Sequence, residues 1–183
     1  MIQIRKIWLL PLLLFAFTAC IDKKQEQSVE VDTAEEVKQK KEEVPDIANS
    51  SFKDGMTGTV YHYYLMVRTA LFNDDLETAQ DASENIANSF NEDFPELKSL
   101  SESMAEAEDI EQLRSSFSEF SIEVETLFKE NLSEGTIYKQ FCPMAFNNEG
   151  AFWFAEIEEI KNPYGGEKMP ECGSVKETIK PKK

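Results

Sequence analysis

Apolar side chains recur every three to four residues through the middle of the chain, which is the period of amphipathic helices that pack on a core. The first stripe predicts a helix with an inward face of Val60, Tyr64, Val67 and Leu71. A second helix is expected behind Asp74, because Asp74 and Glu77 have the spacing of a capping box. Its inward positions are Leu76, Ala79, Ala82 or Ser83, Ile86 and Phe90.

Two further helices are predicted before the pattern changes at Gly135. A short one starts at Pro95, since proline is favoured in the first helical turn, and carries Leu97 and Leu100. A long one is capped by Asp109 and stops near Leu132. Its inward face consists of Ile110, Leu113, Phe117, Phe120, Val124, Leu127 and Phe128.

Beyond Gly135, short strand-like pieces alternate with turns rich in Asn, Pro and Gly. Residues 137–141 and 151–157 are predicted strands, and the basic tail from Lys176 is expected to lack regular structure. The pattern therefore predicts a mostly α fold, an antiparallel helical bundle of about four helices with an irregular, short-strand C-terminal cap.

The N-terminus has the order of an exported lipoprotein. Arg5 and Lys6 precede an apolar run too short to remain as a membrane span, and small residues follow. Residues 1–19 then form a signal peptide, and Cys20 takes the lipid, palmitate among the acyl chains, at the end of a lipobox. A plain signal peptide with an incidental cysteine is the alternative. Domain boundaries follow: a polar tether over 20–50, the folded part over 51–178 and a basic tail over 179–183.

The net negative charge of the chain excludes some classes of binding partner. The chain carries a formal net charge of −16, and removal of Arg5 and Lys6 with the signal leaves 17 basic and 35 acidic residues, or −18. Such a surface repels nucleic acid and anionic lipid headgroups, so neither is an expected partner, and it raises the local concentration of cations. The acids are spread along the helices, which indicates a solvated face.

The predicted cap concentrates sulfur. Cys142 and Met144 are two residues apart, Met169 and Cys172 are three apart, and a turn around Pro163 can bring the two pairs together. Two thiolates and two thioethers suit Cu(I) or Ag(I), whereas calcium and magnesium require oxygen ligands. Neighbouring prolines restrict the backbone of both segments.

Two other interpretations of the cysteines stay open. In an oxidising compartment Cys142 and Cys172 can form a disulfide, which closes a loop of about thirty residues and contributes about 3 kcal/mol, with Met144 and Met169 as core filler. Buried free thiols are the third possibility. Cys142 and Cys172 could also alternate, binding metal when reduced and forming a disulfide when oxidised.

His62 is the chain's single histidine, and Met66 follows four residues later on the same flank of the first predicted helix. The pair could serve as an auxiliary copper site, although a lone helix histidine is more often a surface or partly buried residue. No catalytic constellation is present: the sequence has no glycine-rich phosphate loop, nucleophile elbow, HExxH or CxxC motif. We therefore do not expect an enzyme.

Several segments resemble one family. They are Tyr64-Leu65, Ala70-Leu71, Asp74-Asp75, residues 114–121, Cys142-Pro143-Met144-Ala145, Trp153, residues 159–164, Gly166, Met169 and Cys172-Gly173. The family is an uncharacterised exported domain found alone in lipoproteins and appended to heavy-metal (copper and silver) efflux adaptor proteins. The resemblance covers about residues 55–178. It implies Cys142, Met144, Met169 and Cys172 as metal ligands. The family is expected to have an aromatic residue where this chain has Gly165, a departure that could loosen the turn.

The function expected is a lipid-anchored protein that binds Cu(I) or Ag(I) and serves metal efflux, with an efflux adaptor protein as partner. It would sit on the inner or outer membrane facing the periplasm, or on the exterior of the cell envelope. The alternative is a non-catalytic structural or partner-binding lipoprotein whose cap is stapled by a Cys142–Cys172 disulfide. That alternative expects an exposed apolar patch at Phe152, Trp153 and Phe154, because three consecutive residues of a strand must use both faces.

Overall fold

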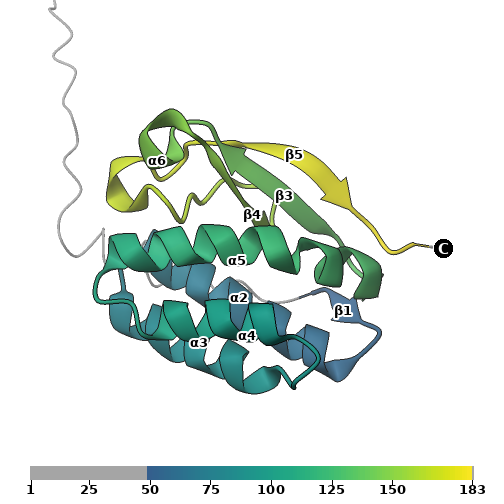
Figure 1. Ribbon diagram of the computed structural model, residues 1–183. Helices are drawn as coiled ribbons and strands as arrows, with labels where there is room; N and C mark the ends of the chain where they lie inside the picture. The colour runs from purple at the N-terminus through teal and green to yellow at the C-terminus, as the bar shows by residue number, and fades with distance from the viewer. Residues whose placement is uncertain (1–48, 183) are drawn as a thin grey trace, which may run out of the picture.

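A computed structural model describes residues 49–182 (Figure 1). The signal peptide, Cys20 and nearly all of the predicted tether lie outside these residues. The described part is mostly α, with four long helices followed by short antiparallel strands. The helices are α2 (Gly55–Phe72), α3 (Leu76–Ser89), α4 (Pro95–Ala105) and α5 (Ile110–Asn131).

Three helices begin at an aspartate whose side chain accepts a hydrogen bond from a backbone N–H of the first turn. Asp54 caps α2, Asp75 caps α3 and Asp109 caps α5. These bonds satisfy donors that a helix start otherwise leaves free. The prediction of Asp109 is confirmed, but that of Asp74 is wrong by one residue, because Asp74 adopts a positive φ of 57° in the turn before the cap. Pro95 opens α4 as predicted.

The core lies between the helices and the C-terminal strands. Tyr64 of α2 is fully buried at its centre, where its ring contacts the rings of Phe117, Phe128 and Phe154. The Tyr64 hydroxyl pairs with the Ser121 hydroxyl at 2.8 Å and accepts the Phe154 N–H at 3.0 Å. One aromatic side chain thus connects α2, α5 and the strands. The apolar stripes predicted for the first and last helices are buried, with Ile110 and Leu127 partly so.

The C-terminal part is more regular than predicted. Strands β3 (Ile137–Cys142), β4 (Ala151–Ala155) and β5 (Ser174–Ile179) form an antiparallel sheet in the order β4-β3-β5, which lies over α5 in Figure 1. A two-stranded ladder joins β1 (Ser51–Phe52) to β2 (Leu132–Glu134). The expectation that the tail from Lys176 lacks regular structure is wrong, because β5 runs through Ile179, which is buried and pairs with Ile137.

The expected apolar patch on the aromatic strand is also absent from the described surface. Trp153 and Phe154 are fully buried on opposite faces of β4, and Phe152 is half-buried beneath the ammonium of Lys139, 3.7 Å from its ring centroid. The ring of Tyr164 packs against Trp153, with the ring centroids 5.9 Å apart. Both faces of the strand are therefore occupied. Within residues 49–182, no helix is long and apolar enough to cross a membrane.

Candidate functional site

The two cysteines of the cap are joined by a disulfide. Cys142 ends β3 and Cys172 precedes β5, thirty residues later, with their Cα atoms 5.5 Å apart. Cys142 is fully buried, whereas Cys172 is half-buried and donates its N–H to the Met169 carbonyl at 3.2 Å. Of the interpretations that the sequence left open, the structure contains the disulfide. Its position also joins the two sulfur-bearing segments, as the metal hypothesis requires.

The two methionines differ in their surroundings. Met144 stands at the start of the short helix α6 (Ala145–Asn148) and is 53% exposed. Met169 follows the 3-10 turn η1 (Gly166–Lys168) and is half-buried. Each is within three residues of one end of the disulfide. In this oxidised state Met144 is largely open to solvent rather than packed as core filler, so that part of the disulfide interpretation is wrong for Met144.

Met169 lies in a loop that the side chain of Asn162 closes. Asn162 shapes it with three hydrogen bonds: its N–H donates to the Pro170 carbonyl at 2.9 Å, its side-chain amide donates to the Met169 carbonyl at 3.1 Å, and its side-chain oxygen accepts the Tyr164 N–H at 3.0 Å. Asn162 is fully buried. The asparagine therefore ties residues 162–170 into one unit.

Other atoms of the loop approach Gly165 closely. A Cβ atom at Gly165 would lie 2.7 Å from both the Asn162 amide nitrogen and the Met169 Cβ. The loop thus closes around the missing side chain, and an aromatic residue there would require a different loop conformation. The loop leaves no room for the aromatic residue that the family resemblance implies at this position.

The comparisons with known proteins cover the helices and stop short of this site. A family described as "Protein of unknown function (DUF3347)" matches residues 60–135. Over this stretch the chain is similar to that family. The match begins in α2 and ends after β2, so both sulfur-bearing segments lie beyond it. No curated protein and no solved structure matches the chain. The DUF3347 similarity thus supports an uncharacterised helical domain and supplies no activity.

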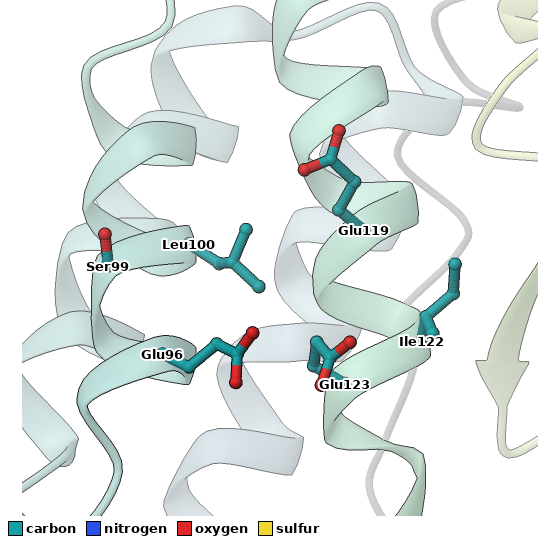
Figure 2. A pocket seen from close by; sticks show the side chains of 6 residues that line it. All are labelled: Glu96, Ser99, Leu100, Glu119, Ile122 and Glu123. Carbon is teal, nitrogen blue, oxygen red and sulfur yellow. The ribbon is translucent and has the colours of Figure 1, made fainter.

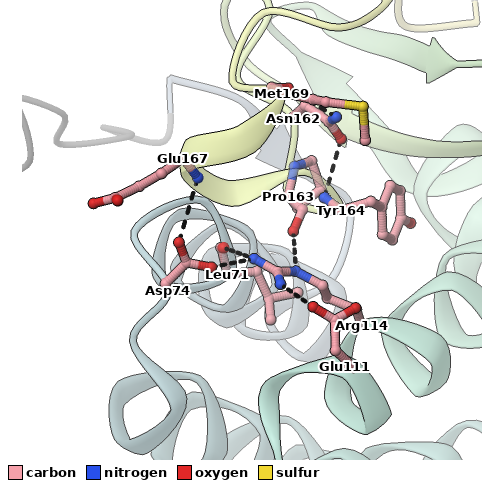
Figure 3. Close-up of polar contacts among 9 residues, drawn as sticks. All are labelled: Leu71, Asp74, Glu111, Arg114, Asn162, Pro163, Tyr164, Glu167 and Met169. Atoms are coloured by element: carbon pink, nitrogen blue, oxygen red, sulfur yellow. Dashed lines mark hydrogen bonds and ion pairs between the residues drawn. The ribbon is translucent and has the colours of Figure 1, made fainter. Parts of the chain in front are cut away.

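A buried arginine in the DUF3347-like region fastens the loop to the helices (Figure 3). Arg114 of α5 donates through Nε to the Pro163 carbonyl at 2.9 Å and through Nη2 to the Leu71 carbonyl at 3.0 Å. Its guanidinium also pairs with Asp74 at 2.5 Å and with Glu111 at 2.8 Å. The planar fork of arginine suits such simultaneous contacts. Arg114 enters the sequence-based prediction only as the first residue of the 114–121 segment of the family resemblance, although its position four residues after Ile110 and three before Phe117 places a charge on the inward face.

Tyr164 anchors the middle of the loop. Its ring packs against those of Phe117, Phe146 and Trp153, and its hydroxyl donates to the Phe152 carbonyl at 2.8 Å. Burial raises the pKa of Tyr164 well above the usual value for tyrosine. The next turn approaches Asp74, whose side chain accepts the Glu167 N–H at 3.3 Å. The NPY segment is thus held by its own hydrogen bonds and ring contacts, independently of the cysteines.

In the part of the chain that the structure describes, His62 makes no hydrogen bond, ion pair or ring contact with the cysteines or methionines of the cap. His62 and Met66 both lie exposed on α2, and the His62 ring packs against the neighbouring Tyr63 ring at a centroid distance of 5.3 Å. Among residues 49–182, no group of three or more His, Cys, Asp or Glu side chains is placed to hold a metal ion. A metal at the cap would therefore depend on methionine sulfur as well as on the two cysteines.

Proposed function

We propose that this chain is an exported lipoprotein, anchored through Cys20, whose cap cysteines act as a disulfide when oxidised and as part of a soft-metal site when reduced. The observation that supports the proposal is the juxtaposition of Cys142 and Cys172, each with a methionine within three residues. The resemblance to domains of heavy-metal efflux adaptors supports copper or silver resistance as the setting, with such an adaptor as the partner.

The chemistry needs a reductant. An exported dithiol would supply two electrons and two protons, so that the sulfur–sulfur bond becomes two thiols while the reductant becomes a disulfide. Binding of Cu(I) or Ag(I) then releases the thiol protons and leaves thiolate ligands, because metal binding and thiol deprotonation are coupled. Thioethers from Met144 and Met169 would complete a sulfur-only ligand set that favours soft monovalent ions.

Access to the site favours entry at Cys172. Cys142 is fully buried at the end of β3, whereas Cys172 is half-buried and Met144 is exposed. A cation attracted by the acidic surface would meet the methionine sulfurs and Cys172 before Cys142. Transfer to a partner would then proceed by ligand exchange in the reverse order.

A Cu(I) titration of the reduced and the oxidised chain tests this proposal. The reduced chain should bind one Cu(I) per chain, and the oxidised chain should bind at least tenfold more weakly. The double substitution Met144→Leu and Met169→Leu should weaken binding, while Met56→Leu on α2 serves as the matched control. Absence of stoichiometric binding after reduction, or equal loss in the control, contradicts the metal function.

A permanent disulfide staple in a partner-binding lipoprotein is the second candidate. The full burial of Cys142 favours it, since a buried disulfide resists exchange with thiols. A thiol count of the chain isolated from cells distinguishes the two: a permanent staple predicts a fully oxidised pair under all growth conditions, including copper stress. Membrane attachment is tested separately, because Cys20→Ser should release the chain from the membrane fraction in either case.

A further inference from the structure

A groove runs between α4 and α5, on the helical part of the molecule (Figure 2). It has a volume of about 380 Å³ and is lined by Glu96, Ser99 and Leu100 of α4 and by Glu119, Ile122 and Glu123 of α5. The sulfur site contributes no residue to it. The groove is therefore a separate feature that the proposed metal function does not use.

The apolar part of the groove is unusually open. Ile122 is 55% exposed, and within residues 49–182 it is one of three large apolar side chains with comparable exposure. Leu100 of α4 packs at the edge of the core and is half-buried. Ile122 lies off the inward stripe of α5, so core packing does not account for an isoleucine at this position.

Three carboxylates also line the groove. In Figure 2 Glu96 and Leu100 extend from α4 toward α5, Glu119 lies one turn along α5 from Glu123, and Ile122 extends from the side of α5 away from α4. None of the three glutamates makes a hydrogen bond or ion pair with another of the described residues, and no lysine or arginine lines the groove. By contrast, Glu125 on the same helix is neutralised by Lys129 and Lys139.

We propose that the groove binds a basic amphipathic helix of a partner protein, whose apolar face contacts Leu100 and Ile122 with separate side chains and whose lysine or arginine side chains lie against the glutamates. The charge pattern selects this occupant. A nucleic acid or an anionic lipid surface is repelled by the carboxylates, and a second copy of the chain would bring a further net charge of −16 to the same face. Helix-in-groove recognition uses this combination of an apolar anchor and flanking charges.

The test uses the purified chain and a fluorescently labelled peptide of about 16 residues, long enough to form a helix, with leucine on one face and lysine on the flanks. The triple substitution Glu96→Gln, Glu119→Gln and Glu123→Gln should weaken binding about tenfold, because each exposed ion pair changes affinity by about twofold to fivefold. Ile122→Ser should weaken it further. A matched control removes the same charge elsewhere, at Glu77, Glu84 and Glu171, and should leave the affinity within about twofold.

The results separate the alternatives. Equal weakening by the groove and the control triples would show non-specific attraction and would overturn the proposal. So would no saturable binding of the lysine peptide, or equal binding of a peptide with glutamate in place of lysine. A doubled mass in sedimentation that the groove triple abolishes would identify a second copy as the occupant, which also overturns it. Since no residue of the groove belongs to the cap, failure here leaves the metal proposal unaffected.

Discussion

Replacement of Arg114 by methionine should destabilise the chain by about 3 kcal/mol, because the arginine satisfies a buried carbonyl that nothing else in the described contacts reaches. The Pro163 carbonyl loses its donor, at a cost of about 1–3 kcal/mol for a buried unsatisfied group. The Leu71 carbonyl keeps backbone donors from the helix end, so its loss is smaller. The pairs with Asp74 and Glu111 add about 1 kcal/mol or less, since both carboxylates are partly exposed.

Urea unfolding of the oxidised chain measures this effect. Trp153 is the tryptophan of the described residues and packs against Tyr164, so its fluorescence reports on the fastened loop. Arg114→Lys should fall between the wild type and Arg114→Met, because lysine keeps the charge near Asp74 but lacks the fork that reaches both carbonyls. Glu111→Gln removes the exposed partner alone and should change stability by less than about 0.5 kcal/mol.

The refuting result is specific. If Arg114→Met matches Glu111→Gln in stability, the guanidinium does not fasten the loop and its hydrogen bonds to the two carbonyls contribute nothing net. A loss of more than about 5 kcal/mol would instead indicate that the helices themselves depend on Arg114, because single substitutions reach that range only when a buried network collapses.

Three other outcomes follow from the structure. Reduction of the Cys142–Cys172 bond should lower the free energy of unfolding by about 3 kcal/mol, and a double alanine variant should match the reduced chain in denaturant titrations. Burial raises the pKa of Tyr64 and Tyr164, so the unfolded chain releases these protons first; stability should decline above about pH 10, and Tyr64→Phe should reduce that slope. Gly165→Ala should cost about 1–3 kcal/mol, as measured by thermal unfolding, because its Cβ meets Asn162 and Met169.

The helices were predictable because local patterns decide them. Apolar spacing located α2 and α5, and Asp109 and Pro95 marked two helix starts. The capping box predicted Asp74 as the N-cap of α3, one residue before the observed cap, Asp75. The two aspartates are adjacent, and the sequence allows either to cap the helix. What decides between them is tertiary: Asp74 turns away to meet Arg114, which leaves Asp75 to accept the Thr78 N–H. A pattern in sequence carries no information about a partner forty residues away.

The structure of the C-terminal cap was harder to predict, because its strands are held by pairing between residues far apart in the sequence. Lys176 lies in a strand held by β3, and the six-residue pattern of β5 has few apolar positions to signal it. The aromatic strand alternates as expected, but Trp153 is buried by a contact with Tyr164, eleven residues later, which the pattern of the strand itself does not predict. The proximity of Cys142 and Cys172 was predictable as a possibility from composition and compartment, whereas their bonded state required the coordinates.

The way the loop is held bears on both proposed states of the cysteines. Asn162 closes residues 162–170, Arg114 fastens Pro163 and the Tyr164 ring is packed in the core, so none of these contacts involves sulfur. Reduction removes one covalent link, and because the other anchors do not depend on it, we expect Cys172 to stay near Cys142 after the bond breaks. If the two thiols are held close in this way, metal binding requires little further loss of conformational entropy. The same anchors make re-oxidation fast, because the effective concentration of one thiol near the other stays high. Under the proposed metal function, these anchors would keep the two thiols close enough either to bind one cation or to form the disulfide again.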